Sequence, residues 1–333
     1  MCVNVLLVSF LATLSQHGMH DAVRLMRGCI TAREGISSGE VKLIQETVLY
    51  GHGGGKGGKI VKRQRCHYHI VFDRENLRFA RSAQGETKEY VLTADSFMKT
   101  DRNPEHGVRI GSRDSEEGHP GVFFRVFDPH IIGMTPALPC HWYVHRWRDF
   151  LNTEPNECNI YEEKIGDVQA KHICYARNQT VVDVWIAPDQ GPSVIRADLS
   201  ATKGGVPLVD SMTCSNKLYR ESGVWFPEEL VHRRTFNGEM VTEYTIRVTE
   251  ARFNFVCDRT AFTLQGLAPE KGSYIRHDQA PISVWDGEKA VPVSHVMGVK
   301  EAGPDWLFWG AVAFFIVGIG LTLARIIRTK RFV

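Results

Sequence analysis

Two pairs of histidines have spacings that occur in metal sites. His67 and His69 alternate along a predicted strand, so their side chains share one face and lie about 7 Å apart. His141 and His145 are four residues apart, which places them on one face of a helix. The helical pair lacks the glutamate of the metalloprotease motif H-E-x-x-H, so it does not predict a zinc hydrolase. Because the chain has 14 histidines, chance pairs are expected, and we interpret both as structural or surface residues.

A glycine-rich segment has the spacing of a phosphate-binding loop. Residues 53–59, GGGKGGK, match the pattern G-x4-G-K. In a phosphate-binding loop a Ser or Thr follows the lysine and ligates magnesium, and a helix begins there. Here Ile60 follows, and strands are predicted on both sides. We therefore interpret the segment as the tip of a long hairpin.

Sequence signatures of covalent catalysis are missing. There is no G-x-S-x-G elbow, and none of the eight cysteines lies in a nucleophile signature or a C-x-x-C pair. Adjacent carboxylates at residues 116–117, 162–163 and 228–229 are typical of solvated surfaces. In an oxidising compartment the cysteines can form up to three disulfides, with a connectivity that their spacing leaves open. We predict a protein that is not an enzyme, with no catalytic, cofactor-binding or metal-binding residue.

One helix and a long series of strands must position the remaining side chains. At residues 20–33 the apolar positions follow a helical period that includes Met26, Cys29 and Arg33, and Gly35 ends the helix. Apolar residues then alternate with period two, which predicts strands. We expect these strands at residues 40–50, 60–73, 77–81, 89–94, 123–127, 171–177, 180–187, 193–200, 211–221, 224–235, 240–249 and 252–256.

The predicted fold class is α+β and mainly β, a curved antiparallel sheet with the N-terminal helix packed on it. Asn237-Gly238, between two strand-like runs, is the strongest hairpin signal in the chain. No strand–helix–strand rhythm occurs, so a parallel sheet is not expected. Residues at about 95–165 are rich in charge and in Gly and Pro, and we predict a charged loop insertion there, with a short helix at 141–151.

The longest apolar segment lies near the C-terminus. From Trp306 to Ala324 nineteen residues carry no charge, enough for a helix about 30 Å long, the thickness of the bilayer core. We predict a transmembrane helix at 306–327 and a basic cytoplasmic tail at 328–333, since positive charges favour the cytoplasmic side. A buried helix of a soluble core and a processed sorting signal are the alternatives. The anchor's interfacial and basic residues are Trp306, Trp309, Arg325, Arg328, Lys330 and Arg331.

The anchor implies that the rest of the chain is translocated. Residues 1–17 contain an apolar run, and we predict a signal peptide there, although no Lys or Arg precedes the run. A different start codon and a buried first element are alternatives. The extracytoplasmic domain is then expected at 18–300 and a short linker at 301–305, on the periplasmic side of the cytoplasmic (inner) membrane. Without the four tail charges, residues 1–324 carry −2 of the net charge of +2, which argues against a nucleic acid partner.

Three segments resemble the LolA/LolB-type lipoprotein-carrier fold. They are MHDAVRLMRGCITAREGISSGEVKLI at 19–44, HIVFDRENLRFAR at 69–81 and TEYTIRVTEARFNFVCDRTAFTLQGLAPEKGSYIRHD at 242–278. FDPHIIG at 127–133 is also similar to anchored or secreted planctomycete-type proteins of this class. The resemblance spans about residues 19–278 and implies a half-barrel sheet that holds helices on its concave side and shelters acyl chains.

The resemblance implies a function in binding. We expect a membrane-tethered periplasmic binding or transfer module for an apolar ligand, a lipid or a lipoprotein acyl chain. A sensor or regulatory ectodomain of an envelope signalling complex is the alternative, and a protein partner in the envelope is compatible with both. A tethered chain cannot diffuse as a shuttle does. The residues expected to line an apolar groove are Tyr68, Ile70, Phe72, Tyr244, Ile246 and Val248.

Overall fold

A computed structural model of the protein describes residues 20–51, 59–101, 107–113, 129–130, 132–134, 157–177, 180–278 and 281–293. The predicted strand at 123–127, the predicted helix at 141–151, the signal peptide and the anchor lie outside these ranges. Within them, no helix is long and apolar enough to cross a membrane. The first element is a helix at residues 20–34, as the periodicity predicts.

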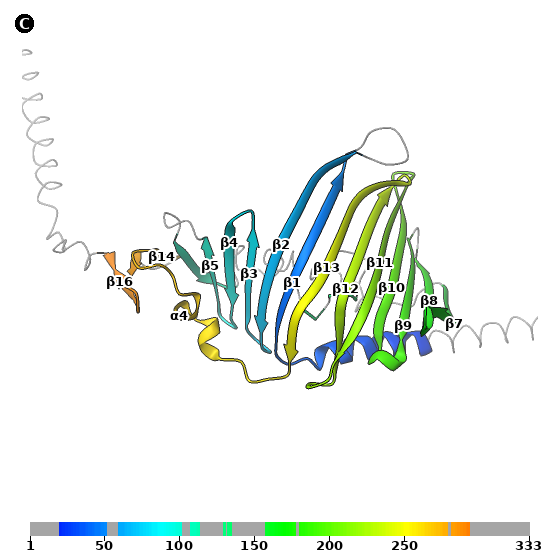
Figure 1. Ribbon diagram of the computed structural model, residues 1–333, viewed down its shortest axis with the longest axis horizontal. Helices are drawn as coiled ribbons and strands as arrows, with labels where there is room; N and C mark the ends of the chain where they lie inside the picture. The colour runs from blue at the N-terminus through cyan, green and yellow to red at the C-terminus, as the bar shows by residue number, and fades with distance from the viewer. Residues whose placement is uncertain are drawn as a thin grey trace, which may run out of the picture.

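The described strands form one open sheet (Figure 1). The strands of its first half are β1 (Gly39–Tyr50), β2 (Ile60–Phe72), β3 (Leu77–Ala83), β4 (Glu86–Leu92), β5 (Ser96–Asp101) and β6 (Val108–Ser112). The second half contains β7 (Glu157–Ile165), β8 (Val168–Arg177), β9 (Thr180–Ala187), β10 (Ser193–Lys203), β11 (Val206–Tyr219), β12 (Val224–Phe236) and β13 (Glu239–Phe253). The short strands β14 (Tyr274–His277), β15 (Ser283–Trp285) and β16 (Ala290–Pro292) complete it.

Two meanders meet in the middle of this sheet. The strand order is β16-β15-β14-β6-β5-β4-β3-β2-β1-β13-β12-β11-β10-β9-β8-β7. Most neighbouring strands follow one another in the chain, whereas β1 pairs with β13, so that Gly39 faces Phe253, and β6 pairs with β14. All these pairs are antiparallel except β14 with β6. The prediction of a mainly antiparallel, curved open sheet is confirmed, and Figure 1 shows the long central strands leaning together.

The hairpin between β12 and β13 forms where the sequence predicts it. Asn237 and Gly238 have φ values of 54° and 76°, the positive angles that a two-residue hairpin turn requires. The prediction of separate strands at 240–249 and 252–256 is wrong, because the single strand β13 runs through the first range and ends at Phe253. Its register shifts opposite Lys42 and Leu43, which makes Thr249 the extra residue of a β-bulge. The bulge interrupts the alternation, and the sequence pattern therefore breaks there although the strand continues.

Part of the region expected as a charged loop insertion is strand. β5, β6 and β7 lie within residues 95–165, and Met98 and Val108 are buried on one face of the sheet. Their neighbours Lys99 and Arg109 face each other across β5 and β6 on the other side of the sheet. The charges therefore belong to one face of a half-buried pair of strands, and the high local charge concealed the alternation.

The two faces of the sheet are covered by different segments. On the inner face, defined by the main core cluster, Ala22, Met26 and Cys29 of the helix pack with side chains from most of the strands. On the outer face, Val91 and Met98 pack against a second cluster that includes Phe262 and Leu267. These two residues belong to a turn of 3-10 helix (Arg259–Phe262) and to α4 (Leu264–Leu267). Both segments follow β13 in the chain and pack on the outer face.

Candidate functional site

The residues predicted to line an apolar groove share the inner face of β2 and β13. Tyr68, Ile70, Phe72, Tyr244 and Ile246 are at most 4% exposed, and Val248 is half-buried against the same cluster. β1 lies between the two strands, and its Leu43 faces both Tyr68 and Val248. The six side chains therefore belong to one apolar surface, packed with the N-terminal helix. Their role as ligand-binding residues stays a prediction.

Polar side chains border this apolar surface toward the turn between β12 and β13. Asp210 and His232 are buried, and the His232 Nε2 atom lies 3.0 Å from Asp210 Oδ1. Arg234 donates to both carboxylate oxygens of Asp210, at 2.7 and 3.0 Å. Burial alone would raise the pKa of Asp210, but the hydrogen bonds from His232 and Arg234 outweigh it and lower this pKa. The His232 ring stacks on Tyr244, with centroids 4.5 Å apart, which joins the polar cluster to the apolar surface.

A second polar contact lies on the same face at β1 and β2. The Tyr68 hydroxyl donates to Gln45 Oε1 at 3.1 Å, and Gln45 Nε2 donates to Thr47 Oγ1 at 2.9 Å. Burial raises the pKa of Tyr68, so its hydroxyl stays protonated. Arg81 donates to Cys66 Sγ at 3.4 Å.

Three nitrogen atoms on this side of the sheet are buried without a hydrogen-bond partner among the described residues. They are Nη1 of Arg33, Nε of Arg81 and Nδ1 of His232. Arg33, on the helix, is 5% exposed, and its guanidinium lies 4.8 Å from the centre of the Phe226 ring. Burial lowers the pKa of Arg33 to about 10, although the neighbouring thiols of Cys214 and Cys29 act in the opposite direction. A buried cation without a carboxylate is rare, because burial removes its hydration without replacing it.

The outer face carries a shallow pocket of about 230 Å³ over β13, β1, β2 and β3. The pocket contains the predicted histidine pair, His67 and His69. Among the described residues, no three His, Cys, Asp or Glu side chains are grouped to hold a metal ion. The other predicted pair, His141 and His145, lies outside the described residues. The lining residues are Lys42, Leu43, Ile44, His67, Tyr68, His69, Ala80, Ser82 and Thr249.

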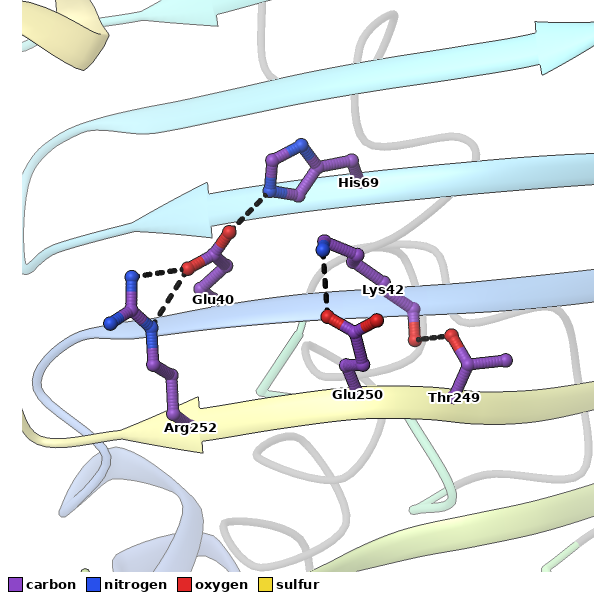
Figure 2. Close-up of polar contacts among 6 residues, drawn as sticks. All are labelled: Glu40, Lys42, His69, Thr249, Glu250 and Arg252. Carbon is purple, nitrogen blue, oxygen red and sulfur yellow. Dashed lines mark hydrogen bonds and ion pairs between the residues drawn. The ribbon is translucent and has the colours of Figure 1, made fainter.

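Ion pairs hold the polar side chains at one end of this pocket (Figure 2). Glu40 accepts hydrogen bonds from Arg252 at 2.8 and 2.6 Å, and its other oxygen lies 2.8 Å from His69 Nε2. Lys42 Nζ lies 2.7 Å from Glu250, and Thr249 donates to the Lys42 carbonyl at 3.1 Å. The sequence indicates His67 and His69 but not Lys42 and Thr249, because only the strand register brings β1 and β13 beside β2.

Comparisons with known proteins give likenesses of fold at low sequence identity. No family model matches the chain, and no curated protein does. Solved structures similar to it include a domain described as an outer membrane lipoprotein-sorting protein from Vibrio parahaemolyticus, with a TM-score of 0.40 and 9% identity, covering 74% of this chain and 97% of that chain. The likeness is one of fold. The LolA/LolB-type resemblance predicted from the sequence is found again here.

Two further structures have the same level of identity. A DUF1329 family protein from Desulfovibrio piger has a TM-score of 0.40 and 10% identity, covering 76% of this chain and 98% of that chain. A chain of the MucA/MucB complex from Pseudomonas aeruginosa has a TM-score of 0.22 and 10% identity, covering 71% of this chain and 100% of that chain.

Proposed function

We propose that this chain is a binding or transfer module that holds an apolar ligand, a lipid or a lipoprotein acyl chain, against the inner face of its sheet. The observation that carries the proposal is an apolar surface on that face combined with a buried cation beside it. One continuous apolar surface includes Tyr68, Ile70, Ile246 and the helix residue Met26. Beside it lies Arg33, a buried cation whose Nη1 atom has no hydrogen-bond partner among the described residues. An apolar surface with a few polar groups at its border is the usual lining of a small-molecule site.

The helix at residues 20–34 supplies the movable part of this proposal. It contacts the β10–β13 half of the sheet, where Arg33 lies over Phe226 and Gly28 approaches Pro192. A single helix of this length is held mainly by its buried stripe, so its displacement exposes the apolar surface below without unpairing any strand. The ligand replaces part of the contact between the helix and the inner face of the sheet. The polar end of the ligand then pairs with Arg33.

The proposal includes the membrane anchor at 306–327. A module tethered to the cytoplasmic membrane, with its sheet domain on the extracytoplasmic side, receives and hands over an apolar ligand at the membrane surface. Membrane fractionation with an epitope at each end, followed by protease protection, tests this arrangement. Recovery of both epitopes in the soluble fraction contradicts the tether and leaves the binding proposal intact.

Copurified lipid tests the binding itself. The chain is truncated after residue 304, so that the predicted anchor contributes no lipid, and is purified without detergent from the compartment in which it is expressed. Organic extraction and mass spectrometry are expected to find close to one acyl lipid per chain. A lipid content no higher than that of a soluble control protein purified in parallel contradicts the proposal.

A further inference from the structure

We infer that the outer-face pocket binds a phosphate group, separately from the apolar ligand proposed for the inner face. Its lining forms two rows across β1, β2 and β3. In the first row Lys42 faces His69, which faces Ala80, and in the second Ile44 faces His67, which faces Ser82. The small side chains of β3 create the hollow, because Ala80 and Ser82 lie beside two larger imidazole rings. Adjacent rows on one face of a sheet are about 7 Å apart, so both imidazoles reach a group bound between them.

The chemistry of the lining selects an anion. None of the nine lining residues is acidic, whereas Lys42, His67 and His69 can be cationic and Ser82 and Thr249 carry hydroxyls. His67 is exposed at the pocket mouth. The carboxylates of Glu40 and Glu250 lie at the rim and hold His69 and Lys42 by ion pairs (Figure 2). These ion pairs already restrict the His69 and Lys42 side chains, so anion binding costs less conformational entropy. Each of the two cations retains further N–H groups that can donate to an anion.

The bulge in β13 completes the pocket. Thr249 is the extra residue there, and it adds an outer-face side chain that regular alternation would not supply. Its hydroxyl is bonded to the Lys42 carbonyl, which fixes it beside the lysine. Bulges of this kind redirect a side chain next to a site. A volume of about 230 Å³ is small for a whole cofactor and large enough for a phosphate group with the first atoms attached to it.

Ion pairs on the outer face surround the pocket. They are those of Glu40 with Arg252, Glu250 with Lys42, Glu89 with Arg78, Glu46 with Arg65 and Glu229 with Arg247. Each carboxylate in these pairs has a cationic partner, so the neighbouring acidic groups are compensated. When His69 gives its Nε2 proton to the Glu40 hydrogen bond, its Nδ1 atom accepts in the neutral ring and donates only in the protonated ring.

Equilibrium dialysis of the full-length chain in a neutral detergent against radiolabelled inorganic phosphate tests the site. Binding of phosphate to the unchanged chain is expected to be saturable. Lys42→Met and His67→Gln should each weaken it about tenfold, because each removes one charge-assisted hydrogen bond. His67→Gln changes an exposed side chain, so it keeps the test open should Lys42→Met fail to fold. Lys217→Met, which removes an exposed ion pair with Glu228 away from the pocket, is the matched control and should bind as the unchanged chain does.

A second arm distinguishes the source of the phosphate. The same proteins are floated with phosphatidylcholine vesicles with and without phosphatidic acid. Capture that needs phosphatidic acid and is lost in His67→Gln assigns the site to a lipid headgroup, whereas binding of inorganic phosphate alone assigns it to a soluble phosphate compound. Absence of both, or binding that both substitutions leave unchanged, overturns the inference. The lipid content of the inner face is measured independently, so either proposal can fail alone.

Discussion

Replacement of Arg33 by methionine is expected to stabilise the ligand-free protein. The guanidinium is 5% exposed, and burial lowers its pKa well below the ordinary value, to about 10, which corresponds to a charged form destabilised by on the order of 3 kcal/mol. A group whose folded-state pKa is lowered in this way destabilises the fold throughout the range below pH 10. Methionine fills a similar volume without a charge. Loss of the stacking on Phe226 removes about 1–2 kcal/mol of favourable interaction, which leaves a net gain of about 1–2 kcal/mol.

The assay is urea denaturation of the unchanged chain and of Arg33→Met at pH 7, with tryptophan fluorescence as the measure of unfolding. Arg24→Met is the matched control on the same helix, because that arginine is exposed and pairs with the exposed Asp21. The free energy of unfolding of this variant should change by less than about 0.5 kcal/mol. If Arg33→Met instead lowers the free energy of unfolding by more than about 1 kcal/mol, the guanidinium supports the fold and the reasoning is refuted. A gain in stability accompanied by loss of bound lipid is the result that the proposed function predicts.

Three further predictions concern the scaffold. Met26→Ala should lower the free energy of unfolding by about 2–5 kcal/mol in urea, because Met26 is fully buried between the helix and the sheet. Asp210→Asn should cost about 3 kcal/mol at pH 7 by removing the buried carboxylate that pairs with His232 and Arg234. It should also flatten the acid side of the stability profile, since the lowered pKa of Asp210 gives a stabilisation present above about pH 4 and lost at lower pH. Gly238→Ala should lower the free energy of unfolding by about 1 kcal/mol in thermal unfolding, because the φ of 76° at this position is unfavourable for a residue with a Cβ atom. Gly28→Ala in the helix should not lower it, because the added Cβ atom meets only ordinary contacts.

Local pattern was sufficient for most elements of the fold. The helix at 20–34 and the strand β9 follow from apolar periodicity, and the turn at Asn237-Gly238 follows from residue type. The same periodicity placed Arg33 in the buried stripe of the helix, although a charge there looks like an exception. In each case the signal and the structure that it specifies lie within a few residues of each other.

Long-range pairing could not be predicted in the same way. The alternation along β1 and β13 shows which side chains share a face, but it does not show that Gly39 lies beside Phe253. The outer-face pocket depends on that pairing and on the bulge at Thr249, so the sequence indicated its histidines without the lysine and the threonine. Arg33 and Phe226 likewise meet only because the helix crosses a strand from the other half of the chain.

Photocrosslinking tests the central claim most directly. The full-length chain, in membranes, is loaded with a fatty acid that carries a diazirine at the end of its acyl chain, irradiated, and mapped by peptide mass spectrometry. Binding on the inner face predicts labelled peptides that contain Tyr68–Phe72 or Tyr244–Val248, with labelling that an excess of unmodified fatty acid suppresses. Labelling confined to residues 306–327, or spread over both faces of the sheet and insensitive to competitor, would contradict an apolar ligand site on this chain.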